Sequence, residues 1–137
     1  MMDIQRKARL CLVLAATAVA TVTSAATEAA TNKAALSWHS SWFVKTMCYK
    51  DTRSFAQNAL SRNGFKTAAT PPNAVLASDN STVVEVSYAP AQTSYHPNQF
   101  ARVQFTVTAM SNDSNAARTA RNRVRENIQK QRYIDTC

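Results

Sequence analysis

The segment Ala101-Arg102-Val103-Gln104-Phe105-Thr106-Val107-Thr108-Ala109 alternates apolar and polar residues without interruption. Neighbouring side chains of a β-strand point to opposite sides of a sheet, so this alternation predicts a strand with one buried and one solvent-facing side. A similar alternation over 83–88 predicts the preceding strand, and Val75-Leu76 is a candidate for a further short strand. Residues 89–98, which include two prolines, are expected to form a long hairpin loop.

A helix is predicted directly after this alternating strand. Ser111-Asn112-Asp113-Ser114 contains several residues that cap helix N-termini. The apolar residues that follow recur at helical spacing, and they are Ala117, Ala120, Val124 and Ile128. Basic residues border this apolar stripe, with Arg118, Arg121, Arg125 and Arg132 on one edge and Arg123 and Lys130 on the other. Residues 133–137 are expected to form either a last short strand or a tail.

An earlier helix is predicted between Asp51 and Gly64. Asp51 or the threonine after it can cap the start, and apolar residues at 55, 56, 59 and 60 make one buried side. Gly64 is the only glycine in the chain, and it stands where a helix ends in a left-handed residue. Residues 41–49 are rich in aromatic and β-branched side chains and are predicted to be a strand, although so short an apolar run also suits a helix.

Together these elements predict an α+β domain with an antiparallel sheet of three to four strands and two helices on one face. The order β-α-β-β-α, with or without a short last strand, is that of the split βαβ or ferredoxin-like arrangement. In that arrangement the last strand returns beside the first. The predicted topology would therefore bring Cys137 next to Cys48.

The N-terminal residues have the three parts of a secretory signal peptide. A basic start is followed by an apolar stretch over 10–22 and by small residues over 23–26. The apolar stretch is shorter than the about 20 residues that a membrane-spanning helix needs. We therefore divide the chain into a signal peptide (1–25), a flexible leader (26–37) and a single α+β domain (38–137). This organisation predicts an exported protein without a transmembrane segment in its mature chain, periplasmic in a Gram-negative bacterium and otherwise secreted.

Cysteine content and charge add two expectations. Removal of the signal peptide takes away Cys11 and leaves Cys48 and Cys137, which should form a disulfide in an oxidising compartment. The chain has 16 Lys and Arg against 8 Asp and Glu, a formal net charge of +8. Such an excess of positive charge favours anionic partners.

Several kinds of chemistry are not indicated by the sequence. A single glycine does not supply the glycine-rich loops that bind nucleotide phosphates, and the His-Glu-x-x-His zinc motif is missing. We therefore expect no cofactor and no metal site. The two histidines, His39 and His96, keep open the alternative of a small envelope hydrolase, although no nucleophile-elbow motif surrounds them.

The leading hypothesis is a small exported binding protein without catalytic activity. Its candidate contact residues are Tyr95 and His96 in the long hairpin loop and Arg118, Arg121, Arg125 and Arg132 in the last helix. The expected partner is an acidic protein, for which this chain would act as an inhibitor or immunity-type protein, or an anionic envelope polymer. Nucleic acid is not expected, because no aromatic residues are interleaved with the arginines. A structural accessory subunit of an envelope assembly is a further alternative.

Overall fold

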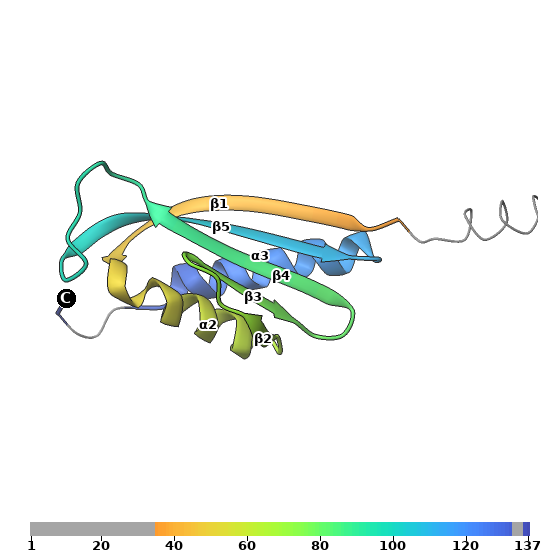
Figure 1. Cartoon of the computed structure of the whole chain (residues 1–137). Helices are drawn as coiled ribbons and strands as arrows, with labels where there is room; N and C mark the ends of the chain where they lie inside the picture. The colour runs from red at the N-terminus through yellow and green to blue at the C-terminus, as the bar shows by residue number, and fades with distance from the viewer. Residues whose placement is uncertain (1–34, 133–135) are drawn as a thin grey trace, which may run out of the picture. The chain divides into compact units, whose positions relative to one another are not determined.

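The computed structural model describes residues 35–132 and 136–137. The helices and strands are β1 (Ser37–Cys48), the short 3₁₀ helix η1 (Tyr49–Asp51), α2 (Thr52–Arg62), β2 (Lys66–Ala69), β3 (Ala74–Ser78), β4 (Thr82–Pro90), β5 (Phe100–Ser111) and α3 (Ser114–Lys130). The five strands form one antiparallel sheet in the order β1-β5-β4-β3-β2 (Figure 1). The predicted signal peptide and the predicted leader up to residue 34 lie outside the described residues.

The predicted ferredoxin-like arrangement with three to four strands is wrong, although the broader α+β class holds. Strands β2 to β5 follow one another as a meander, and β1 joins the sheet at the far side of β5. Strand β2 was not predicted. Its four residues are all exposed, so they show no alternation of apolar and polar side chains. Its position is fixed by backbone pairing with β3, which a pattern of side chains does not reveal.

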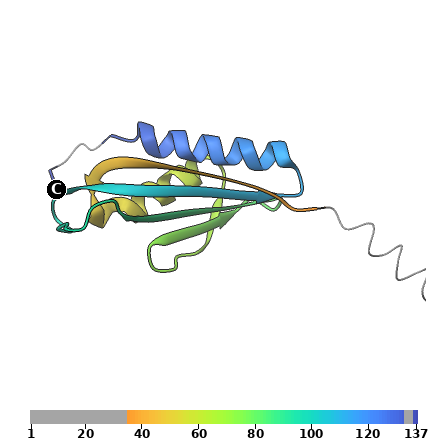
Figure 2. The same ribbon diagram turned by 90° about the horizontal axis from the view of Figure 1, so that it is seen from above.

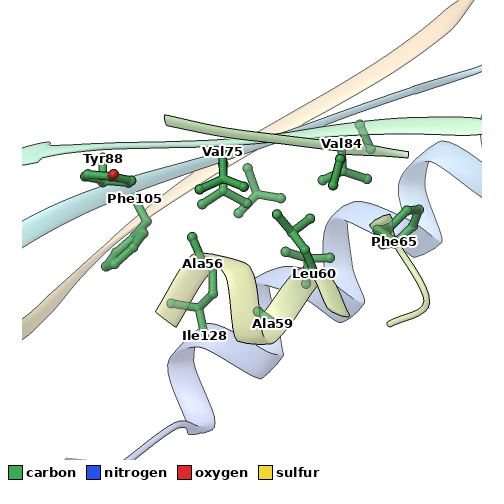
Figure 3. Close-up of a cluster of buried hydrophobic side chains, with 14 of the residues drawn as sticks. Ala56, Ala59, Leu60, Phe65, Val75, Val84, Tyr88, Phe105 and Ile128 are labelled. Carbon is green, nitrogen blue, oxygen red and sulfur yellow. The ribbon is translucent and has the colours of Figure 1, made fainter. Parts of the chain in front are cut away.

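The hydrophobic core lies on one side of this sheet, between the strands and the two helices. Alternate residues of β4 and β5 are buried there, as the alternating segment predicted. Helix α2 contributes Ala56, Ala59 and Leu60, and α3 contributes its predicted apolar stripe (Figure 3). Helix α3 runs alongside β1 and β5 (Figure 2), whereas α2 lies against the β2–β4 part of the sheet.

The helix ends follow from local residues. Helix α2 ends at Gly64, whose φ of +83° is the left-handed conformation that favours glycine. The Phe65 N–H donates to the Leu60 carbonyl and the Gly64 N–H to the Ser61 carbonyl, which is the hydrogen-bond pattern of a Schellman ending. At the start of α3, the Asp113 carboxylate accepts hydrogen bonds from the N–H groups of residues 115 and 116.

Strand β1 forms one edge of the sheet, and charged side chains occupy that edge. The Lys45 ammonium group donates to the carbonyl oxygens of Gln129 (3.0 Å) and Gln131 (2.7 Å) at the end of α3. Burial lowers the pKa of Lys45, while its charge is favoured by the negative end of the helix dipole. Arg121 donates to the backbone carbonyl of Ser40, an unpaired group of the strand edge. These contacts reduce the tendency of β1 to pair with a strand of another chain.

Cys48 and Cys137 form a disulfide, with their Cα atoms 5.6 Å apart. Cys48 ends β1 and is fully buried. Cys137 reaches it after α3 and not as part of a last strand, since the described C-terminal residues 136 and 137 are not in a strand. The disulfide therefore ties the end of the chain to the end of the edge strand.

Replacing Cys137 with serine should lower the free energy of unfolding by about 2–4 kcal/mol, because the disulfide closes a long loop of chain. Urea denaturation of the oxidised protein and of the Cys137→Ser variant measures this difference, and buried Cys48 keeps its place in the core of both. Unchanged unfolding midpoints, or alkylation of both cysteines in the native protein without prior reduction, would contradict the assignment.

Candidate functional site

The sheet presents a second side, opposite the helices, on which both tryptophans of the chain lie. Trp38 stands beside Met110 of β5, and Trp42 stands beside Thr106. The two indole side chains are 68% and 65% exposed. Tryptophan is a highly buried residue on average, so two exposed tryptophans on one side of one strand are a notable feature of the surface. We call Trp38, Trp42 and Met110 the tryptophan surface.

Hydroxyl-bearing and apolar side chains border the two tryptophans, and the exposed Val44 follows Trp42 on the same side of β1. Ser40 lies between them on β1, and its hydroxyl is 3.0 Å from the hydroxyl of Thr108 on β5. The nearest carboxylate in the register is Glu85 on β4, which pairs with Thr108. The tryptophans thus lie beside hydroxyl-bearing residues of β1 and β5. The acidic residue Glu85 lies on β4, the next strand of the sheet.

The tryptophan surface was not predicted, because the pattern of aromatic and β-branched residues predicts a strand that starts only at residue 41. The structure starts β1 at Ser37, so Trp38 belongs to the same strand as Trp42. A signal was present: Trp38 and Trp42 have even numbers, whereas the core residues Phe43 and Met47 have odd numbers. Strand alternation alone places the two pairs on opposite sides of a sheet.

Two of the four predicted contact arginines, Arg121 and Arg125, contact β1. The Arg121 guanidinium donates to the Ser40 carbonyl (3.2 Å), and Arg118 donates to the Asn115 side chain (2.9 Å). The Arg125 guanidinium lies 5.8 Å from the centre of the Phe43 ring, and its Nε is buried without a hydrogen-bond partner among the described residues. Arg132 is exposed beyond the end of α3. Arg121 and Arg125 therefore contribute to packing at the strand edge as well as to surface charge.

The predicted loop contact, Tyr95 and His96, lies elsewhere. The Tyr95 ring packs on the Tyr49 ring, with centroids 4.7 Å apart, next to the C-terminal end of β1. Burial raises the pKa of the Tyr49 hydroxyl, and the neighbouring tyrosines 95 and 88 add to the shift. His96 is exposed, and its carbonyl accepts a hydrogen bond from the Gln99 N–H within the loop. The loop is thus at the opposite end of β1 from Ser40, and the structure does not bring its residues together with Arg121.

The sequence leaves open a hydrolase site that would use His39 or His96. The structure places His39 Nε2 3.0 Å from the Ser114 hydroxyl at the start of α3. The adjacent Asp113 carboxylate accepts from backbone N–H groups of α3, where it caps the helix. The pair joins β1 to α3, and the hydrolase alternative stays a hypothesis.

Two hollows lie on the helical side of the molecule. The first, of about 350 Å³, is between the end of α2 and the last turns of α3, and is lined by Arg62, Asn63, Arg123, Glu126, Asn127, Lys130 and Gln131. The second, of about 340 Å³, adjoins it, sharing Asn63 and Arg123, and extends toward Asp79 and Asp113. The first hollow is lined by three cations and one carboxylate, and we call its lining residues the basic groove.

Comparison with known proteins found no matching family, no matching curated protein and no matching solved structure. Within residues 35–132 and 136–137, no helix is long and apolar enough to cross a membrane. The same part of the chain contains no cluster of three or more His, Cys, Asp or Glu residues suited to a metal ion.

The Asp79 carboxylate at the edge of the second hollow is held by the β3–β4 turn. Desolvation alone would raise the pKa of Asp79, but hydrogen bonds from the N–H groups of Ser81 and Thr82 and from the Ser81 hydroxyl outweigh it and lower the pKa. A lowered carboxyl pKa contributes stability above the ordinary value near 3.8, which is lost as the pH falls through the folded value.

The free energy of unfolding of the Asp79→Asn variant should therefore depend less on pH below about 4 than that of the unchanged protein. Thermal unfolding at several acidic pH values measures this slope, and Asp113→Asn is a control for the removal of a carboxylate at a helix cap. An Asp79→Asn variant whose stability falls with acid as steeply as that of the parent would contradict the assigned hydrogen bonds.

Proposed function

We propose that this chain is an exported, non-catalytic binding protein whose partner is an acidic protein that docks on the tryptophan surface. The observation that carries the proposal is the two-thirds exposure of both Trp38 and Trp42 on the helix-free side of β1. Large aromatic side chains are enriched among the residues that dominate protein–protein binding energies. Each buries a large apolar area at a small cost in side-chain entropy.

The arginines of α3 supply the charge complementarity. Helix α3 packs along β1, and the Arg121 guanidinium reaches the backbone of Ser40, between the two tryptophans in sequence. Arg118, one turn earlier on α3, is exposed. Residues 1–25 hold three Lys or Arg and one Asp, so the chain without the predicted signal peptide carries a formal net charge of +6. This charge would attract an acidic partner from a distance and orient it toward this edge.

The sheet side, and not the strand edge, is the docking surface in this proposal. The Arg121 guanidinium donates a hydrogen bond to the Ser40 carbonyl at the edge of β1. The Lys45 ammonium group donates to the Gln131 carbonyl on the helical side of the sheet. Both features disfavour the addition of a foreign strand beside β1. A partner that covers the indole rings has to approach from the side of the sheet opposite the helices.

The compartment is part of the same proposal. The basic, apolar and small-residue order at the N-terminus supports export. The Cys48–Cys137 disulfide suits an oxidising compartment. Together they support a periplasmic or secreted location.

Site-specific photo-crosslinking in the producing cells tests this function. A photoreactive residue at Thr106, beside Trp42, should form an adduct with an acidic protein, whereas the same residue at exposed Asn58 on α2 should not. An adduct with an anionic polymer, equal adducts from both positions, or no adduct from Thr106 would each contradict the proposal.

Once the adduct identifies the partner, its affinity for purified variants gives the energetic test. Trp42→Ser should weaken binding by about 30-fold, the effect of a residue that contributes about 2 kcal/mol at the centre of an interface. Tyr95→Ser is the matched control, because it removes a partly exposed aromatic ring outside the tryptophan surface. Equal losses in the two variants would overturn the assignment of the surface.

A further inference from the structure

The basic groove on the helical side of the molecule is separate from the tryptophan surface. Helices α2 and α3 are in contact, and both place alanines in the shared core, namely Ala56 and Ala59 on α2 and Ala117 and Ala120 on α3. Beyond these alanines, Arg62 of α2 and Arg123 of α3 stand on the rims of the hollow. The hollow therefore lies between the end of α2 and the last turns of α3 and is flanked by long cationic side chains.

The cations of this groove are incompletely neutralised. Lys130 forms an ion pair with Glu126 at 3.6 Å, and both side chains are mostly exposed, so the pair is weak. Arg62 and Arg123 make no hydrogen bond or ion pair with the described residues. Two guanidinium groups from different helices thus face one hollow with their donors unused.

Several oxygen groups beside the hollow accept hydrogen bonds, whereas Glu126 in the lining is held, within the described part of the chain, only by its ion pair with Lys130. The carbonyl oxygens of Leu60 and Ser61 in the last turn of α2 accept hydrogen bonds from Phe65 and Gly64. The Asp79 carboxylate, in the adjoining hollow, accepts three hydrogen bonds from its own turn. The negative end of α2 is therefore capped, and Arg123 does not contact Asp79.

The chemistry of the lining defines the kind of ligand. Guanidinium groups bind carboxylate and phosphate oxygens through paired, charge-assisted hydrogen bonds. Asn127 also lines the hollow, and its side-chain amide adds a neutral donor and acceptor. Every lining residue carries a polar or charged side chain, so a compact anion fits the hollow better than a hydrophobic molecule.

We propose that the basic groove binds a small multivalent oxyanion, carrying phosphate or carboxylate groups, between Arg62 and Arg123. Phosphate and carboxylate groups both present negatively charged oxygens to the arginines. Separate titrations with inorganic pyrophosphate and with citrate distinguish the two groups. This site is independent of the partner proposed for the tryptophan surface, because its lining residues are on the helices and the tryptophans are on the other side of the sheet.

The test is isothermal titration of the disulfide-bonded protein with each anion, together with chemical-shift mapping of the arginine Nε–H and Asn127 side-chain signals. The double variant Arg62→Gln/Arg123→Gln should weaken binding roughly tenfold or more, since charge-assisted hydrogen bonds are lost. The control is Lys50→Gln/Arg102→Gln, which removes the same charge from two exposed residues outside the groove. This control should change the affinity less than about twofold.

Saturable binding of either anion with loss only in the groove variant supports the site, and the anion that binds assigns phosphate or carboxylate as the ligand chemistry. Equal weakening in both double variants would show attraction by overall charge and would overturn the proposal. So would the failure of the unchanged protein to bind either anion up to about 10 mM. Circular dichroism of both variants checks their folding, which exposed substitutions should preserve.

Discussion

The register between β1 and β5 determines what each side of the sheet presents. Phe43 lies opposite Phe105, and their rings stack with centroids 5.4 Å apart in the core. Because side chains alternate along a strand, this pairing places Trp42 on the other side. A slip of one residue would bury the tryptophans under α3 and expose the phenylalanine. The same register therefore determines both the core contacts of β1 and the exposure of its tryptophans.

This constraint also explains the distribution of charge. Helix α3 covers the β1 and β5 side of the core, and its basic residues lie along its two edges. One edge follows β1, where Arg121 and Arg125 contact the strand and its aromatic core residue. The other edge faces α2, where Arg123 stands without a described partner. The two basic edges predicted from helical spacing thus have different surroundings, and only the second borders a hollow.

The parts of the fold that were predictable are those in which side-chain pattern and burial coincide. The alternation over 101–109 located β5, Asp113 located the start of α3, and Gly64 located the end of α2. The predicted capping of α2 by Asp51 is wrong, because its side chain makes no capping hydrogen bond. Strand β2 was not predictable, since its four exposed residues are held by backbone pairing with β3. The cysteine pair was expected from composition and compartment, but the ferredoxin-like topology used to support it is wrong. Of the segment expected to form a strand or a tail, the described residues 136 and 137 are not in a strand, and residues 133–135 lie outside the described residues.

The candidate sites were predictable to a smaller extent. The arginine edges followed from spacing, but which arginines are engaged depends on the packing of α3 against β1, which no local pattern specifies. Tyr95 was considered a contact residue because it lies in a loop, and the structure packs it on Tyr49 at the end of the sheet. Trp38 was not predicted to share a strand with Trp42, because the strand was expected to start at residue 41 and the structure starts it at Ser37. The surface that supports the proposed function thus emerged from register, which is a long-range property.

Intrinsic fluorescence tests the central claim most directly, because Trp38 and Trp42 are the two tryptophans of the chain. If the register places both indoles in water, the native protein without a partner should emit at nearly the wavelength of the urea-unfolded chain. Acrylamide should also quench it almost as efficiently. A blue-shifted native emission that is shielded from acrylamide would show that the tryptophans are buried. That result would contradict both the register of β1 and the docking surface built on it.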